Sequence, residues 1–428
     1  MSKFQLVLLG VFGVFILAAV LTFALYRGSS SSEALLTIWG TFSTQDMSTI
    51  MSNTSLSQDE SFTLNYVEKS PSTLEADFTE ALAQGNGPDL VILRQDQFWN
   101  NKAKLMPIPY SSISQKTFGD TFVESGEIYL TGEGVYGLPL TVDPMVLYYN
   151  RDLLSGASIA KPIAFWDEIF VSTGNLSKRD AAGNLTKSTI ALGETRNISN
   201  AKDILSLLML QAGTPITGFV GTTLQSFLGE SFSLPVAPAD SALEFFTQFS
   251  NPTKAYYSWN RVLPEAQTRF TSGDMAYYLG YASELRALRN KNPTLNFSVT
   301  SVPQSRVSGK TITIGRLYGV SISRGAKNPQ AALAAAWKLS SAEVANAFSQ
   351  ITLWPPARRD LLSQTPTNDS ILPVFYSAAL QSKSWVDPNT TGSAKVFSDM
   401  VDAVTSGRAG TSESVGKADR ELETLIKN

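Results

Sequence analysis

The segment Tyr136–Leu154 constrains the fold of this chain more than any other stretch of its sequence. Its residues, YGLPLTVDPMVLYYNRDLL, are apolar enough for a buried strand, but Asp143 and Pro144 interrupt the run. Proline donates no hydrogen bond to a sheet, so an Asp-Pro pair is unfavourable inside a central strand. The segment therefore predicts a strand that leaves one sheet, crosses a gap and enters another. Val142, Asp143 and Pro144 are the predicted hinge residues of this crossing.

The length and charge of the chain bound its organisation. At 428 residues it exceeds the size at which one hydrophobic core keeps growing, which predicts two domains. The formal net charge is −3 and no basic block occurs, so the sequence gives no electrostatic reason to expect a nucleic-acid partner.

The chain has no cysteine and no histidine. Cysteine nucleophiles, Ser-His-Asp triads, disulfides and zinc sites built on thiolate or imidazole are therefore impossible within it. Chemistry on carboxylates, lysine or tyrosine stays open. No catalytic residue, metal site or cofactor is assigned from the sequence.

The N-terminus carries a long apolar run. Phe4–Tyr26 contains 23 residues without a charge, flanked by Lys3 and Arg27. As a helix, this run would span roughly 30 Å of hydrocarbon. A secretory signal peptide is the alternative, but its apolar region is usually about 7–15 residues. We expect residues 1–27 to form a membrane anchor, with the N-terminus inside, and residues 28–34 to form a flexible tether outside the cell membrane.

Beyond the tether, strands and helices alternate. Leu35–Trp39, Phe62–Val67 and Leu90–Leu93 are apolar or alternating runs typical of strands. Pro71–Gln84 carries apolar residues at a spacing of four and is predicted to be a helix. This order indicates a parallel sheet with right-handed crossovers.

A second crossing is predicted later in the chain. Phe297–Val302 alternates as a strand and ends at Pro303, and Tyr318–Ser323 reads as the strand that returns to the first domain. Thr300 and Ser301 are the predicted hinge residues of this second crossing.

Several motifs together resemble one family. Besides Tyr136–Leu154, they are Gly85–Asp89, Trp166–Glu168 after Pro162, Phe270–Ala276 before Gly280, Val299–Gln304, and Leu317–Ser323 followed by Asn328 and Pro329. In this order they resemble the extracellular solute-binding proteins of ABC importers, the group that includes the maltose-binding protein. Two departures are Ala164, where the family usually has threonine, and Tyr281, where sugar binders often carry tryptophan.

The resemblance implies an α/β, two-lobed periplasmic-binding-protein-like fold of type II, here with an N-terminal transmembrane helix. Lobe one is expected to comprise residues 35–142 and 297–345, and lobe two residues 143–296 and 346–428. In open α/β sheets, ligands bind beyond the carboxyl ends of the strands, and sites prefer domain interfaces. A ligand is therefore expected between the two lobes.

Residues that follow the predicted strands are the candidates for ligand contact. They are Trp39, Thr41, Arg94, Gln95, Asp143, Glu194, Asn197, Tyr281, Glu284, Arg316 and Trp354. Alternatives remain for some of them: Trp39 could belong to the core, Asp143 could only cap the hinge, and Glu194 could pair with Arg196 in solvent. The resemblance places Tyr281 at the position of a stacking ring, which suits the apolar face of a sugar.

The resemblance implies a membrane-tethered, extracytoplasmic protein that captures a sugar or oligosaccharide by hinge closure. It would act as a monomer and deliver its ligand to the permease subunits of an ABC importer. Two alternatives stay open. One is a glycan-active enzyme that uses two carboxylates across a cleft, and the other is a sensory co-receptor with the same fold.

Overall fold

The computed structural model describes residue 16 and residues 34–306, 309–367 and 369–427. The predicted anchor, apart from Ile16, and the predicted tether, apart from Ala34, lie outside these residues. Among the residues that are described, no helix is both long enough and apolar enough to cross a membrane. The membrane anchor therefore stays a prediction.

Strands from both halves of the chain form one continuous path in the order β2-β1-β3-β14-β7-β12-β9-β8. Three short strands join it at its centre, β13 on β7 and β4 and β15 on β14. The bounds are β1 Ala34–Gly40, β2 Phe62–Glu68, β3 Leu90–Arg94, β4 Leu105–Met106, β5 Leu130–Thr131, β6 Gly134–Val135, β7 Leu138–Asn150, β8 Lys178–Arg179, β9 Leu185–Ile190, β10 Thr217–Val220, β11 Thr223–Ser226, β12 Met275–Tyr281, β13 Phe297–Thr300, β14 Thr313–Ser323 and β15 Ser382–Lys383.

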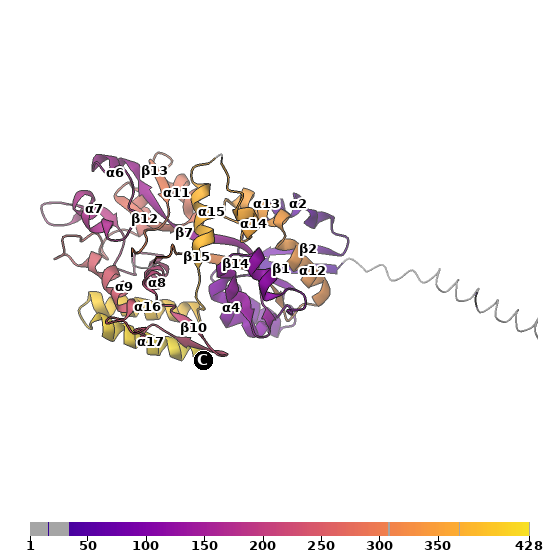
Figure 1. The fold of residues 1–428 in the computed structure, drawn as a ribbon. Helices are drawn as coiled ribbons and strands as arrows, with labels where there is room; N and C mark the ends of the chain where they lie inside the picture. The colour runs from indigo at the N-terminus through magenta and orange to yellow at the C-terminus, as the bar shows by residue number, and fades with distance from the viewer. Residues whose placement is uncertain (1–15, 17–33, 307–308, 368, 428) are drawn as a thin grey trace, which may run out of the picture.

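Helices cover these strands on both sides (Figure 1). Their bounds are α2 Thr44–Ser52, α3 Leu74–Ala83, α4 Gln95–Asn101, α5 Gln115–Thr121, α6 Arg151–Gly156, α7 Glu168–Leu176, α8 Ala201–Ala212, α9 Pro238–Thr247, α10 Ala266–Thr271, α11 Leu285–Lys291, α12 Pro329–Leu339, α13 Ala342–Thr352, α14 Arg359–Leu362, α15 Leu372–Gln381, α16 Thr390–Thr405 and α17 Thr411–Lys427. The predicted α/β alternation is confirmed, with β1 parallel to both β2 and β3.

Strand β7 changes partners at the Asp-Pro pair. Its first part pairs with β14 up to Pro144, and its second part pairs with β12 and β13 from Met145 onward. The predicted crossing is confirmed at this point, but no gap accompanies it, because β7 runs without interruption and every residue except Tyr149 is buried. Proline is tolerated here because the ladder ends on one partner and begins on another at this point. Pro139 is accommodated in a similar way, beside a register shift between β14 and β7.

The buried hydrophobic residues form three clusters. Two of them, which we call the first-lobe clusters, draw on residues 36–142, 317–348 and 357–379. The third, the second-lobe cluster, draws mainly on residues 145–302 and 371–422. β7 lies between the two groups of elements in Figure 1, so the fold consists of two lobes joined by crossing strands.

The C-terminal part of the chain differs from its predicted assignment to lobe two. Phe348, Leu362 and Tyr376 pack in the first-lobe clusters, whereas Phe375 and Phe397 pack in the second-lobe cluster. The sequence shows that these helices have apolar faces, but it does not show which core receives each face.

The second crossing runs along β14, further along the chain than predicted. Thr300 pairs with Leu147 in the second-lobe part of β7. In contrast, Arg316 and Gly315 pair with Asp143 and Pro144, where β7 itself crosses. The two crossing strands, β7 and β14, therefore lie side by side and antiparallel.

Candidate functional site

The carboxyl end of β3 supplies an ion pair from the first lobe. The Arg94 guanidinium donates through Nε and Nη2 to the two Asp96 carboxylate oxygens, each at 2.6 Å. Gln95, which is buried between them, accepts a hydrogen bond from the backbone N–H of Leu317 at 2.6 Å. This bond ties the start of α4 to the crossing strand β14.

The crossing strands supply a second pair of charges. Asp143 and Arg316 are opposite each other in the β7–β14 ladder, so their side chains share one face of the sheet. Asp143 is 1% exposed and accepts a hydrogen bond from the N–H of Ser283 at 2.8 Å. Burial raises the pKa of Asp143 to about 6, while the Arg316 charge and the Ser283 hydrogen bond oppose that shift.

Arg316 is held by residues of the second lobe. Its Nη2 lies 3.0 Å from Oδ2 of Asp203, in the first turn of α8. The Tyr281 hydroxyl donates to the same carboxylate oxygen at 2.7 Å, and the guanidinium lies 3.7 Å from the centroid of the Tyr281 ring. Burial alone would raise the pKa of Asp203, but the Arg316 charge leads a set of favourable interactions that holds this pKa below its usual value.

The segment between β15 and α16 completes the site. Asp387 is buried, forms an ion pair with Lys202 and accepts a hydrogen bond from the Ser393 hydroxyl at 2.8 Å. Burial raises the pKa of Asp387, and the neighbouring Lys202 opposes that shift. The Trp385 ring stacks on Phe397, with centroids 6.0 Å apart, and Lys202 Nζ lies 5.4 Å from the centroid of the Trp385 ring.

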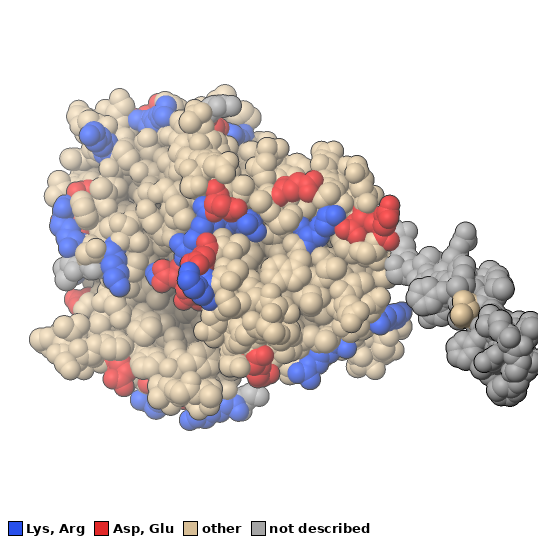
Figure 2. Space-filling view, turned by 45° about the vertical axis from the view of Figure 1, so that its right-hand side comes forward, with Lys and Arg blue, Asp and Glu red and all other residues tan. Residues whose placement is uncertain are grey.

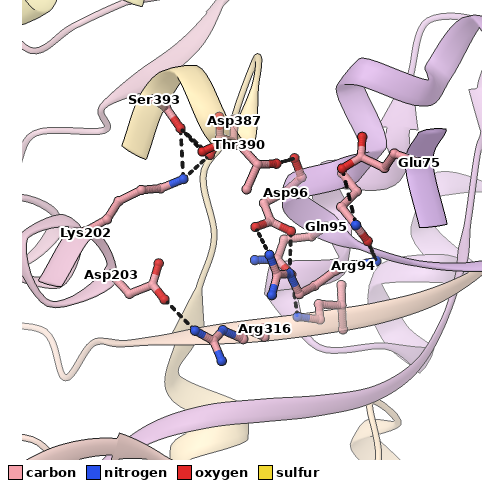
Figure 3. Close-up of polar contacts among 12 residues, drawn as sticks. Glu75, Arg94, Gln95, Asp96, Lys202, Asp203, Arg316, Asp387, Thr390 and Ser393 are labelled. Carbon is pink, nitrogen blue, oxygen red and sulfur yellow. Dashed lines mark hydrogen bonds and ion pairs between the residues drawn. The ribbon is translucent and has the colours of Figure 1, made fainter. Parts of the chain in front are cut away.

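Charged groups from both lobes meet at one small cavity, with Asp96 from the first lobe and Lys202, Asp203 and Asp387 from the second (Figure 3). Its volume is about 20 Å³, room for about one water molecule. The lining residues are Gln95, Asp96, Lys202, Asp203, Tyr281, Ile314, Arg316, Ser384, Trp385 and Asp387. The lobes are therefore close together in this structure, and anything larger than water requires them to separate.

An aromatic group adjoins the charged cluster on the first-lobe side. Phe42, Tyr318 and Trp354 lie within 5.0–5.5 Å of one another, measured between ring centroids. Tyr318 pairs with Arg94 and lies two residues after Arg316 in β14, so its side chain lies on the same face as Arg316. Trp354 is only half-buried.

The structure brings the predicted residues Arg94, Gln95, Asp143 and Arg316 together. Arg94 ends β3 and Gln95 follows it, as predicted, whereas Asp143 and Arg316 lie inside the crossing strands β7 and β14. Tyr281 also belongs to the cluster, but the residue is only 1% exposed and its ring lies against Arg316. It therefore orients Arg316 and Asp203 instead of offering an open stacking face. Glu284 lies behind it, accepting hydrogen bonds from the Tyr281 N–H at 2.9 Å and from the Asn200 amide at 3.0 Å.

Other predicted residues lie away from the cavity. Trp39 is buried in a first-lobe cluster, with Lys69 Nζ 3.9 Å from its ring centroid, and Thr41 is half-buried in the turn after β1. Glu194 accepts a hydrogen bond from Arg261 at 3.2 Å instead of pairing with Arg196, and burial raises its pKa.

Asn197 holds the second-lobe loops together. Its amide donates to the carbonyls of Asn260 and Leu263, both at 2.9 Å. Thr300 and Ser301 line a different surface of the second lobe, together with Phe165 and Arg306.

Five residues of the cluster were not among the predicted contacts: Asp96, Lys202, Asp203, Trp385 and Asp387. Asp96 follows the third predicted strand beside Arg94 and Gln95, so the strand-end rule could have included it. Lys202 and Asp203 follow Asn200, which the sequence marks as a helix start. Trp385 and Asp387 carry no local signal. Among the residues that the structure describes, no group of three or more acidic side chains is arranged to hold a metal ion.

Comparisons with known proteins agree with this architecture. A family model described as bacterial extracellular solute-binding protein matches residues 55–374. Among curated proteins, the maltodextrin-binding protein MdxE of Bacillus subtilis (strain 168) is 36% identical over 75 residues. That alignment covers 17% of this chain and 17% of the relative, so the chain matches less than a fifth of that protein's length.

Solved structures match over almost the whole chain. A cyclo/maltodextrin-binding protein complexed with maltotetraose has a TM-score of 0.74 at 16% identity, covering 94% of this chain and 99% of that one. The sugar-binding protein MalE from Xanthomonas citri has a TM-score of 0.73 at 17% identity, covering 92% and 98%. The GacH receptor of Streptomyces glaucescens, solved with acarbose, has a TM-score of 0.69 at 15% identity, covering 92% and 99%. At these identities the likeness shows the fold alone.

Proposed function

This chain belongs to the family of bacterial extracellular solute-binding proteins, and we propose that it captures a sugar or oligosaccharide between its lobes for an ABC importer. The observation that carries the proposal is the convergence of Arg94–Asp96, Arg316–Asp203 and Trp385 on one interlobe cavity. Several proteins that share the fold were solved with maltotetraose, mannotriose, maltotriose or acarbose.

The chemistry of the cluster suits a polyhydroxylated ligand. Carboxylates accept hydrogen bonds from sugar hydroxyls, and guanidinium and ammonium groups donate to them. Each carboxylate here has lone pairs beyond those used in its ion pair, so a ligand can bind without first breaking the pair. On the face of the molecule shown in Figure 2, basic and acidic side chains are interspersed instead of forming a field of one sign. The small cavity implies that ligand enters an open form and shifts the protein toward closure.

A glycan-active enzyme is less consistent with these contacts. Such an enzyme needs an acid and a base about 5–9.5 Å apart with access to the scissile bond. Asp143 is 1% exposed, Glu194 bonds to Arg261 outside the cavity, and Glu284 lies behind Tyr281. The absence of catalysis stays a prediction. A role in import instead of sensing also stays a prediction, because both roles use the same closure of the lobes.

Isothermal titration calorimetry of the purified chain with maltose, maltotetraose, mannotriose and amino acids tests the proposal. We expect at least one oligosaccharide to bind. Trp385→Ala should weaken that binding roughly tenfold or more, because it removes a ring from the cavity wall. Leu380→Ala, in α15 and outside the cavity, is the matched control. Binding of amino acids but of no carbohydrate would overturn the proposal, and chromatography of the recovered sugars would reveal any turnover.

The cellular setting is part of the same proposal. The anchor of residues 1–27 would hold a monomeric binding domain on the extracytoplasmic side of the membrane, within reach of the permease subunits. Fractionation of cells that express the full chain, or a chain without residues 1–32, distinguishes the possibilities. The full chain should sediment with membranes and the shortened one should not. If both chains sedimented with membranes to the same extent, residues 1–32 would not be a membrane anchor.

A further inference from the structure

A β-hairpin of the second lobe reaches toward the first lobe. It consists of β10 and β11, joined by a tight turn. Ile216 and Leu228, on either side of the hairpin, are buried in the second-lobe cluster. The Thr217 hydroxyl donates to the carbonyl of Val386 at 2.7 Å, and Glu423 of α17 accepts from the Ser226 N–H at 2.6 Å. The hairpin is therefore fixed at its base to the lobe that carries Trp385 and Asp387.

The far end of this hairpin touches a residue of the other lobe. The ring of Phe219, in β10, lies 5.5 Å from the ring of Trp99, in α4, with the planes inclined by 59°. Trp99 packs on a first-lobe cluster and lies one helical turn after Asp96. Phe219 is 47% exposed, so this ring contact lies at the surface. Such an arrangement costs little to separate compared with a buried core contact.

A second contact joins the lobes beside the first. The hydroxyl of Thr390, at the start of α16, donates to the backbone carbonyl of Asp96 at 3.1 Å. In Figure 3 this hydrogen bond lies on the opposite side of the charged cluster from the crossing strand that carries Arg316. Asp96 lines the cavity, and the two contacts reach α4 in its first turn and one turn further, so the lobes meet here through side-chain contacts beside the cavity. We call this place the mouth of the site.

We propose that Trp99 and Phe219 form a clasp across the mouth of the interlobe site, which stabilises the closed form and slows ligand release. The clasp rests on the proposed function, since release presupposes a captured ligand. Neither residue lines the cavity. The pair is therefore a positioning device, acting on the closing equilibrium and not on ligand contact. A contact present only in the closed form raises the apparent affinity by raising the fraction of closed protein.

Stopped-flow kinetics with maltotetraose as the probe tests this. Phe219→Ala and Trp99→Ala should each speed release roughly 5- to 20-fold, the range expected for an aromatic contact with its buried area. The association rate should change less than about twofold, because the open form is unaltered. Phe232→Ala is the matched control, since Phe232 is an exposed ring of the same lobe that stacks on Phe227 instead. An unchanged release rate in both clasp variants overturns the proposal.

A second experiment needs no ligand and separates the clasp from the proposed function. The chain has no cysteine, so Trp99→Cys with Phe219→Cys introduces a unique thiol pair. A short bis-maleimide should join this pair within one chain at least about tenfold faster than the control pair Trp99→Cys with Phe232→Cys. Equal rates for the two pairs overturn the clasp. If none of maltose, maltotetraose and mannotriose binds the unmodified chain while the cross-link forms, the ligand assignment fails and the clasp stands.

Discussion

The two sides of the interlobe site are built in opposite ways. On the crossing side, β7 and β14 form a buried backbone ladder, and β7 continues directly into pairing with β12. On the mouth side, the lobes meet through the Trp99–Phe219 ring contact and the Thr390–Asp96 hydrogen bond. Breaking the first requires many backbone hydrogen bonds, whereas breaking the second requires few side-chain contacts. The lobes should therefore separate at the mouth and bend at the crossing strands.

The charged cluster lies between these two sides. Arg316 belongs to a crossing strand, Asp203 to the second lobe and Asp96 to the first. The distances between these charged groups therefore change when the lobes move apart. Opening at the mouth changes the surroundings of Asp96 and Asp387 most, and those of Asp143 least. Substitutions on the crossing side should accordingly alter the stability of the whole protein, and substitutions at the mouth should alter ligand kinetics.

The largest effect is expected at Gly319 in β14. A Cβ atom there would lie 2.8–2.9 Å from ring atoms and the hydroxyl of the buried Tyr129. Gly319→Ala should lower the free energy of unfolding by about 3 kcal/mol, because the packed ring cannot move aside. Urea unfolding measures this. Gly221→Ala, in the turn between β10 and β11, meets open space at a φ of +63° and should cost only about 1 kcal/mol. Equal losses would contradict the comparison.

A smaller effect, dependent on pH, is expected at Asp143. Its pKa is raised from 3.8 to about 6 in the folded protein, so the folded state holds the proton more tightly than the unfolded state. The free energy of unfolding should then fall as pH rises through that interval, by about 2–3 kcal/mol for this group. Asp143→Asn should remove this part of the pH dependence. Thermal unfolding from about pH 4 to pH 7 measures the difference between the two proteins.

The control for this measurement is Asp120→Asn. Asp120 has a side chain 66% exposed and lies in α5, outside the crossing strands. It should leave the slope of stability against pH unchanged. If Asp143→Asn kept the wild-type slope of stability against pH, the Asp143 carboxyl would not be the source of that slope.

The smallest effect is expected at Thr390. Thr390→Val removes the hydrogen bond to the Asp96 carbonyl and keeps the shape of the side chain. We expect the closed form to be destabilised by about 1 kcal/mol relative to the open form. Stopped-flow kinetics should then show roughly fivefold faster ligand release, with little change in thermal stability. Thr405→Val removes a hydroxyl that bonds within α16, to Val401 at 3.0 Å, and is the control. If ligand release became faster in Thr405→Val but not in Thr390→Val, the Thr390 hydrogen bond would not stabilise the closed form.

Much of the candidate site follows from strand ends that the sequence marks. Arg94 and Gln95 follow an apolar run of four residues, and Asp143 lies in the interrupted run that led to the crossing. The same rule failed for Glu194 and Asn197, because their side chains are satisfied by Arg261 and by loop carbonyls of their own lobe. A polar residue after a strand can face a ligand or bond locally, and the sequence does not distinguish the two.

The sequence by itself determined the alternation of strands and helices, the two-lobed class and the position near 143 where the chain crosses. The alternation and the crossing depend on local periodicity and on the limits that proline imposes, whereas the two-lobed class rests on the length of the chain and on its resemblance to the solute-binding family. Only the tertiary structure decided that β7 stays continuous through Pro144, that Arg316 covers Tyr281, and that Trp385 and Asp387 join the site. Those outcomes depend on which faces of distant segments meet, and contacts between segments nearly 300 residues apart, such as Thr390 with Asp96, leave no local pattern.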